Sequence, residues 1–143
     1  MGLRNKFKMS PRLEVEGIQY EIENTRITIA RAGGSNAKYN AAMEKVAREH
    51  GRAAQLDLLS SAKGIAIVRQ VYVDTVILNW ETLVDGGWVA GIEGPDGGEL
   101  LPVTKENMLA TFDELPDLFI EVKQMAENLT VFRQSNLEAI TKN

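Results

Sequence analysis

Residues 62–80 form the longest apolar stretch of the chain and limit its possible folds more than any other segment. From Ile65 to Trp80 the stretch contains no turn signal, which favours a helix over a strand despite its many β-branched side chains. A helix that is apolar on most sides is buried at the centre of a fold or of an oligomer. The predicted structural core is therefore Ile65, Val68, Tyr72, Val76 and Trp80.

An alternating pattern over residues 13–31 predicts an antiparallel β-hairpin ahead of this helix. Apolar side chains alternate with glutamates and threonines, which is typical of strands with one buried face. The phase of the alternation shifts at Gly17, where we expect a bulge or a turn. Asn24 and Thr25 supply a plausible turn between the two strands.

Three further helices are predicted, at about 36–52, 104–115 and 117–135. Ser35 or Asn36 is expected to cap the first of them, and Thr104 to cap the second. The last one has the cleanest periodicity in the chain, with apolar residues spaced by 4, 3, 4 and 3 positions. This stripe consists of Leu118, Val122, Met125, Leu129 and Phe132.

Residues 84–102 form a glycine-rich loop that separates the predicted central helix from the two C-terminal helices. Half of the 12 glycines lie between positions 86 and 98, which predicts either a short hairpin or a long mobile loop. Trp88 lies in this loop, where it is expected to be partly exposed.

Together these elements predict an α+β, mainly α fold, in which an N-terminal β-hairpin packs on a bundle of about four helices. One globular domain is expected over residues 13–135. A basic, flexible N-terminus (1–12) precedes it and a fraying C-terminus (136–143) follows it.

Composition excludes several classes of function. The chain has no cysteine and one histidine, so thiolate metal sites, cysteine nucleophiles and multi-histidine sites are excluded. We expect no enzymatic activity, no metal and no cofactor. A net charge of −4 argues against a general nucleic-acid-binding surface, and no stretch is long and apolar enough to predict a membrane span. The expected location is the cytoplasm.

Three features are candidates for binding another protein: the basic N-terminus, as an arm for an acidic partner, and two apolar features. Trp88 is one, because tryptophan is enriched at the centres of interfaces. The C-terminal apolar stripe is the other, and its methionine suits an adaptable surface. The stripe has two interpretations at this stage: it packs within the chain, or it forms a seam with a second chain, identical or different.

Several short motifs resemble the tail assembly chaperones of long-tailed, siphovirus-type bacteriophages. They are Asn79-Trp80 at the end of the apolar segment, Pro102-Val103-Thr104-Lys105-Glu106-Asn107 at a helix start, and Leu115-Pro116-Asp117-Leu118. Upstream, Ile27 to Gly33 and the pair Asn36 and Tyr39 are similar to a strand and a helix start of that family.

This resemblance implies a binding protein that holds unassembled tail tube protein and tape measure protein and promotes tube assembly in the bacterial host cytoplasm. It also implies a longer, frameshifted form, and Lys142-Asn143 can be encoded by a run of adenines. The alternatives are a structural virion component (a head–tail connector or a minor tail protein) and a small dimeric adaptor. A homo-oligomer is compatible with each of them.

Overall fold

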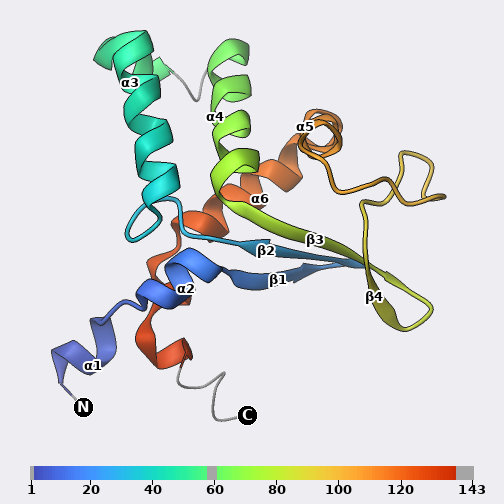
Figure 1. Cartoon of the computed structure of the whole chain (residues 1–143), viewed down its shortest axis with the longest axis horizontal. Helices are drawn as coiled ribbons and strands as arrows, with labels where there is room; N and C mark the ends of the chain where they lie inside the picture. The colour runs from blue at the N-terminus through green and yellow to red at the C-terminus, as the bar shows by residue number, and fades with distance from the viewer. Residues whose placement is uncertain (1, 58–60, 138–143) are drawn as a thin grey trace.

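The chain folds around an antiparallel β-sheet with helices packed against it, as a computed structural model of residues 2–57 and 61–137 shows (Figure 1). Within these ranges, the structure describes all side chains except those of residues 52–57. The strands are β1 (Ile18–Ile22), β2 (Thr25–Ile29), β3 (Ile77–Val84) and β4 (Gly87–Ala90). The helices are α1 (Leu3–Phe7), α2 (Pro11–Glu16), α3 (Ala37–Asp57), α4 (Ala62–Thr75), α5 (Lys105–Glu114) and α6 (Pro116–Glu127), followed by the 3-10 helix η1 (Leu129–Phe132).

The sheet has four strands in the order β1-β2-β3-β4, so the predicted hairpin packed on a four-helix bundle is wrong. A second hairpin, from the middle of the chain, pairs with the predicted one. Strand β3 lies antiparallel to β2, with Ile27 opposite Trp80 and Arg26 opposite Glu81. The sheet therefore combines strands from the N-terminal part and from the middle of the chain, and is not an N-terminal addition to a bundle.

The apolar segment 62–80 is divided between a helix and a strand, not one helix as predicted. Helix α4 ends at Thr75 and β3 begins two residues later. The amide nitrogen of Asn36 donates to the carbonyl oxygens of Thr75 and Arg31, both at 2.9 Å. The backbone N–H of Ala30 donates to the carbonyl of Val76 at 2.8 Å. These hydrogen bonds to distant residues end the helix. The sequence around Thr75 therefore does not predict where the helix stops.

The N-terminal part of the predicted first strand is instead the helix α2. Ser10 caps this helix by accepting a hydrogen bond from the N–H of Leu13, and Pro11 occupies its first turn. Gly17 ends it with a φ of 87°, a conformation that glycine adopts readily. The hairpin thus covers Ile18–Ile29 rather than 13–31, and Leu13 is a buried helical residue.

The C-terminal helix is also shorter than predicted. Helix α6 ends at Glu127, and the side chain of Asn128 accepts a hydrogen bond from the N–H of Thr130, which starts η1. The N–H of Ser10 donates to the carbonyl of Phe132 at 2.8 Å, so η1 is attached to the N-terminal segment. Most of the C-terminal segment that is predicted to fray (136–143), including Lys142-Asn143, lies outside the described residues.

The glycine-rich segment contains a hairpin, which was one of its two predicted conformations. Strands β3 and β4 are joined by Asp85 and Gly86, whose φ values of 49° and 84° fit a tight turn of the kind that pairs adjacent strands. Beyond β4, Ile92 pairs with Leu101 in an isolated bridge. The segment thus contains two antiparallel pairings, one with β3 and one between its own residues.

A continuous chain of aromatic contacts joins the helices to one face of the sheet. Tyr39 of α3 contacts Tyr72 of α4, which contacts Phe119 of α6. Phe119 then packs on Phe112 of α5, and Phe112 packs on Trp80 of β3 with 5.6 Å between ring centroids. Edge-to-face packing of this kind adds to the stabilisation from burial. Among the described residues, no helix has the length and apolar character needed to cross a membrane.

Candidate partner-binding surface

Trp88 lies on the sheet face that points away from the aromatic core. Strand residues alternate between faces, and Trp80 and Ile27 occupy the inner one. On the outer face, Trp88 is the register partner of Leu83, so these two large side chains are adjacent across the β3–β4 pair. Leu83 is exposed and Trp88 is half-buried.

Arg26 of β2 completes this outer surface. Its guanidinium carbon lies 4.6 Å from the centroid of the Trp88 ring, which is a cation–π distance. The same guanidinium pairs with the carboxylate of Glu81 at 2.9 Å, and both side chains are mostly buried. Three strands therefore contribute to a cluster of one tryptophan, one leucine and a fixed ion pair. We call Arg26, Glu81, Leu83 and Trp88 the Trp88 cluster.

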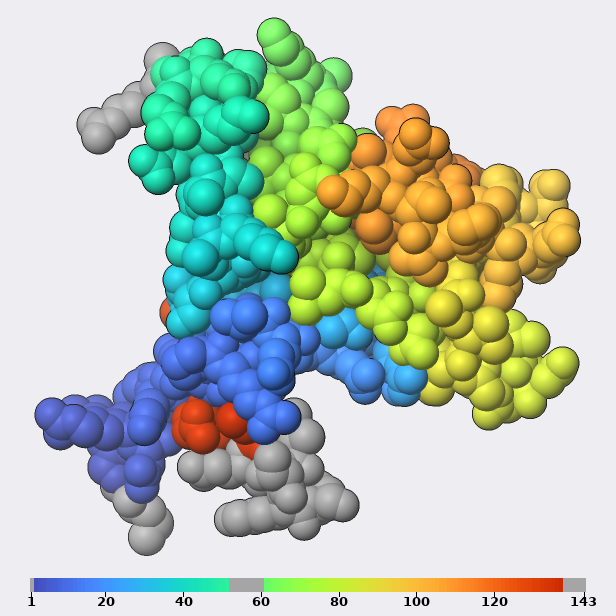
Figure 2. Space-filling model, viewed as in Figure 1, coloured from blue at the N-terminus to red at the C-terminus, as the bar shows by residue number. Residues whose placement is uncertain are grey.

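The opposite side of the hairpin tip is apolar as well. Val84 and Val89 are exposed there, although their positions in the strands place them on the same side as the core residues. The helices do not reach this far along the hairpin, which protrudes at the lower right of the molecule (Figure 2). The tip thus presents large apolar side chains on both faces, and exposed apolar patches are typical of interaction sites.

The predicted C-terminal stripe is divided by the structure. Val122 and Phe132 are 0% exposed and lie within the core, instead of on the surface proposed for them. Leu118 and Met125 are partly buried against that core, and Leu129 alone of the five is largely exposed, at 51%. The stripe therefore packs within the chain over most of its length and does not form one continuous exposed surface.

The predicted core residues lie mostly where expected. Val68, Tyr72, Val76 and Trp80 are buried. Ile65 is partly exposed because it lies in the first turns of α4. Of this surface, only Trp88 is among the residues predicted from the sequence to bind a partner, whereas Arg26, Leu83, Val84 and Val89 are not. The signal that was available for them is the Asp85-Gly86 turn between two alternating runs, which is a hairpin signature.

The described residues include no group of three metal-ligating side chains near one another. In the part of the chain that the structure describes, the side chains with a perturbed pKa are Tyr20, Tyr39 and Tyr72, and each interacts with a glutamate of helix α6. The hydroxyl of Tyr20 donates to the Glu121 carboxylate at 2.9 Å, and this hydrogen bond raises the pKa of Tyr20. Such an arrangement stabilises the packing of β1 on α6.

Residues 34–143 match the family model described as "YdaY prophage protein". The chain belongs to the YdaY prophage protein family. It is therefore a phage-related protein, and the match does not extend to the tail assembly chaperones that its motifs resemble. The matched region of this YdaY family protein includes the β3–β4 hairpin with Trp88 and Leu83, whereas Arg26 lies upstream of it. No curated protein and no solved structure matches the chain.

Proposed function

We propose that this YdaY family protein is a tail assembly chaperone, which binds unassembled tail tube and tape measure proteins of its phage without enzymatic activity. The observation that carries the proposal is the Trp88 cluster on a protruding hairpin whose other face, with Val84 and Val89, is also apolar. The phage-related family and the resemblance of the Asn79-Trp80 and Leu115-Pro116-Asp117-Leu118 motifs support the choice of partner.

The chemistry of the surface suits reversible binding. Trp88 and Leu83 would supply the apolar contact, since a tryptophan buried on binding contributes strongly to affinity. Arg26 and Glu81 already hold each other and the indole ring in place, so little side-chain freedom is lost when a partner arrives. A tube subunit that later leaves for the growing tube needs an anchor of this limited size rather than an obligate interface.

The test is co-expression of the chain with the tail tube protein encoded by the same prophage, followed by affinity purification of the tagged chain. We expect a soluble complex with the unaltered chain. A Leu83→Ala/Trp88→Ala variant should lose the tube protein, because both outer-face anchors are removed. Leu129→Ala is the matched control, since Leu129 is an exposed leucine far from the hairpin in the sequence, and it should retain the complex.

Two results would contradict the proposal. One is the absence of any complex with either the tube or the tape measure protein. The other is the presence of the chain in purified phage particles in stoichiometric amounts, which would favour a head–tail connector or a minor tail protein. Light scattering that finds a stable dimer with no effect on any tail protein would favour an adaptor instead.

A further inference from the structure

A cleft of about 360 Å³ lies at the end of the sheet where β1 turns into β2. Its walls come from that turn, from the loop after β4 and from the junction of α5 and α6. The apolar part includes Leu115, which is exposed, and the half-buried Leu118. A cleft that brings together segments so far apart in the sequence is held in shape by the whole fold.

The charged side chains around this cleft are all negative. Glu23, Glu93 and Glu114 all line it, and no lysine or arginine does. Glu93 accepts a hydrogen bond from the amide of Asn24 at 2.5 Å, and none of the three carboxylates forms an ion pair within the described part of the chain. The cleft therefore suits a segment that combines apolar side chains with positive charge.

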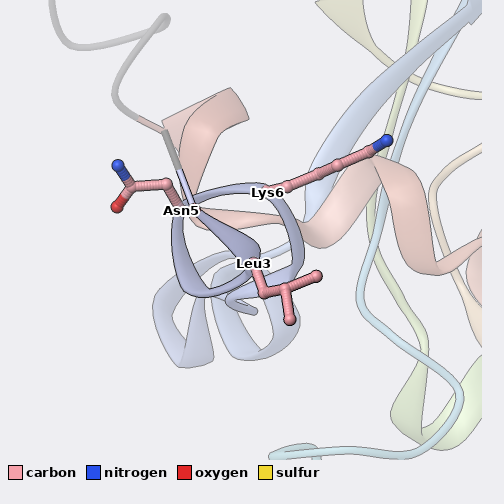
Figure 3. A pocket seen from close by; sticks show the side chains of 4 residues that line it. Leu3, Asn5 and Lys6 are labelled. Atoms are coloured by element: carbon pink, nitrogen blue, oxygen red, sulfur yellow. The ribbon is translucent and has the colours of Figure 1, made fainter.

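Helix α1 has that combination. Leu3 and Phe7 are four positions apart, so they share one face of the helix, and they are 78% and 50% exposed. Arg4, Lys6 and Lys8 surround them, and residues 1–12 contain no acidic side chain. None of the three cations has a carboxylate within ion-pair distance among the described residues. Leu3, Asn5 and Lys6 project from the helix in different directions (Figure 3).

Helix α1 has no buried residue of its own. It is attached to the fold next to η1, where the Arg133 guanidinium lies 5.0 Å from the centroid of the Phe7 ring and the N–H of Gln134 donates to the carbonyl of Lys8. This attachment places α1 at the end of the molecule opposite the β1–β2 turn, which lines the cleft (Figure 1). The helix of one chain therefore cannot fill the cleft of the same chain.

We propose that the cleft binds helix α1 of a second copy of this chain. Leu3 and Phe7 of one copy lie against Leu115 and Leu118 of the next, and the cations of α1 face Glu23, Glu93 and Glu114. The contact joins two different surfaces at opposite ends of the molecule, so each copy presents one free helix and one free cleft. Contacts of this head-to-tail type extend into rings or filaments rather than stopping at a dimer.

Sedimentation velocity of the full chain over a range of concentrations, at low and at high salt, tests this inference. We expect the mass to rise with concentration at low salt and to fall towards one chain at high salt, because the ion pairs are screened. Arg4→Glu/Lys6→Glu on the helix and Glu93→Lys/Glu114→Lys in the cleft should each raise the dissociation constant about tenfold or more. Mixing the two variants should restore assembly, since each then offers the charge that the other needs.

Lys38→Glu/Lys63→Glu is the matched control for the helix variant. Both lysines are exposed, lie on other helices and make no ion pair in the part described, and the change in net charge is the same. This control should assemble as the unaltered chain does. A single-chain mass for the unaltered protein at every concentration would overturn the proposal, as would equal dissociation of control and helix variants or no recovery on mixing. None of these experiments includes a tail protein, so their results neither support nor contradict the proposed chaperone function.

Discussion

The guanidinium of Arg26 lies against the indole ring of Trp88, with 4.6 Å between the guanidinium carbon and the ring centroid, although 62 positions separate them in the sequence. The contact exists because β2 and β4 both pair with β3, on either side of Glu81. It fixes an aromatic side chain on an open sheet face that would otherwise leave it free to rotate.

Trp88 should account for most of the tryptophan fluorescence that iodide can quench. The other tryptophan, Trp80, is 2% exposed beneath helix α5, whereas Trp88 lies on the outer face. Trp88→Phe should therefore leave an emission that is blue-shifted and largely protected from iodide. Adding the tube protein to the unaltered chain should reduce quenching. Equal quenching before and after Trp88→Phe would mean that Trp80, not Trp88, is the accessible ring.

Phe132→Ala should destabilise the fold by about 3–5 kcal/mol, because it leaves a cavity where a fully buried ring packs beside α2. Leu129→Ala, in the same sequence stripe, should change the free energy of unfolding by less than about 1 kcal/mol, since Leu129 is largely exposed. Urea denaturation of the two variants measures the difference. Similar decreases in the free energy of unfolding for both variants would mean that Phe132 and Leu129 belong to one continuous surface.

Asn36→Asp should lower the free energy of unfolding by about 2–4 kcal/mol, although the two side chains have almost the same shape. The aspartate keeps the acceptor that caps α3 at the N–H of Tyr39, but it loses both donations, to Thr75 and to Arg31. A carboxylate would also face two carbonyl oxygens. Thermal unfolding of Asn36→Asp against Ser35→Asp, at the exposed neighbouring position, isolates the lost donors, and an unchanged midpoint would refute their role.

Asn36 shows which parts of the fold can be predicted from the sequence and which cannot. Caps and turns such as Asn36, Thr104 and Asp85-Gly86 depend on residues that are adjacent in the sequence. The start of α3, the start of α5 and the β3–β4 turn are therefore predictable. The division of segment 62–80 depends on hydrogen bonds from Asn36 and Ala30, which lie far away in the sequence. A β-branched apolar run suits both a helix and a strand, and only the pairing with β2 decides between them.

The candidate site is likewise predictable only where it depends on residues close together in the sequence. Trp88 is conspicuous as a tryptophan among glycines, but its partner Arg26 lies in another strand, and knowing their contact requires the order and register of the sheet. The C-terminal stripe has an ideal helical spacing, yet spacing does not distinguish a buried face from an exposed one. Val122 and Phe132 are buried because β2, α2 and the aromatic chain cover them.

The stability of the protein should fall at high pH. Burial, with smaller contributions from Tyr39 and Glu127, raises the pKa of Tyr72 well above its usual range. In the unfolded chain this tyrosine loses its proton near pH 10, while the folded protein holds it neutral. The contribution of Tyr72 to the stability of the folded protein is therefore fully present below about pH 10 and is lost as the pH rises further.

Urea denaturation at pH 8 and pH 11 measures this effect, and Tyr72→Phe is the informative variant. The free energy of unfolding of the unaltered chain should fall more between these two pH values than that of the variant, which has no proton to lose at this position. Burial also raises the pKa of Tyr39, so part of the decline should remain in the variant. An identical decline in both proteins would show that Tyr72 is not the group responsible.

Calorimetric titration of the purified chain with monomeric tail tube protein tests whether the Trp88 cluster binds a tail protein, as we propose. We expect binding by the unaltered chain, a dissociation constant raised about tenfold or more by Leu83→Ala/Trp88→Ala, and a change below about twofold for Leu129→Ala. Equal affinity of the unaltered chain and the Leu83→Ala/Trp88→Ala variant would contradict the proposal.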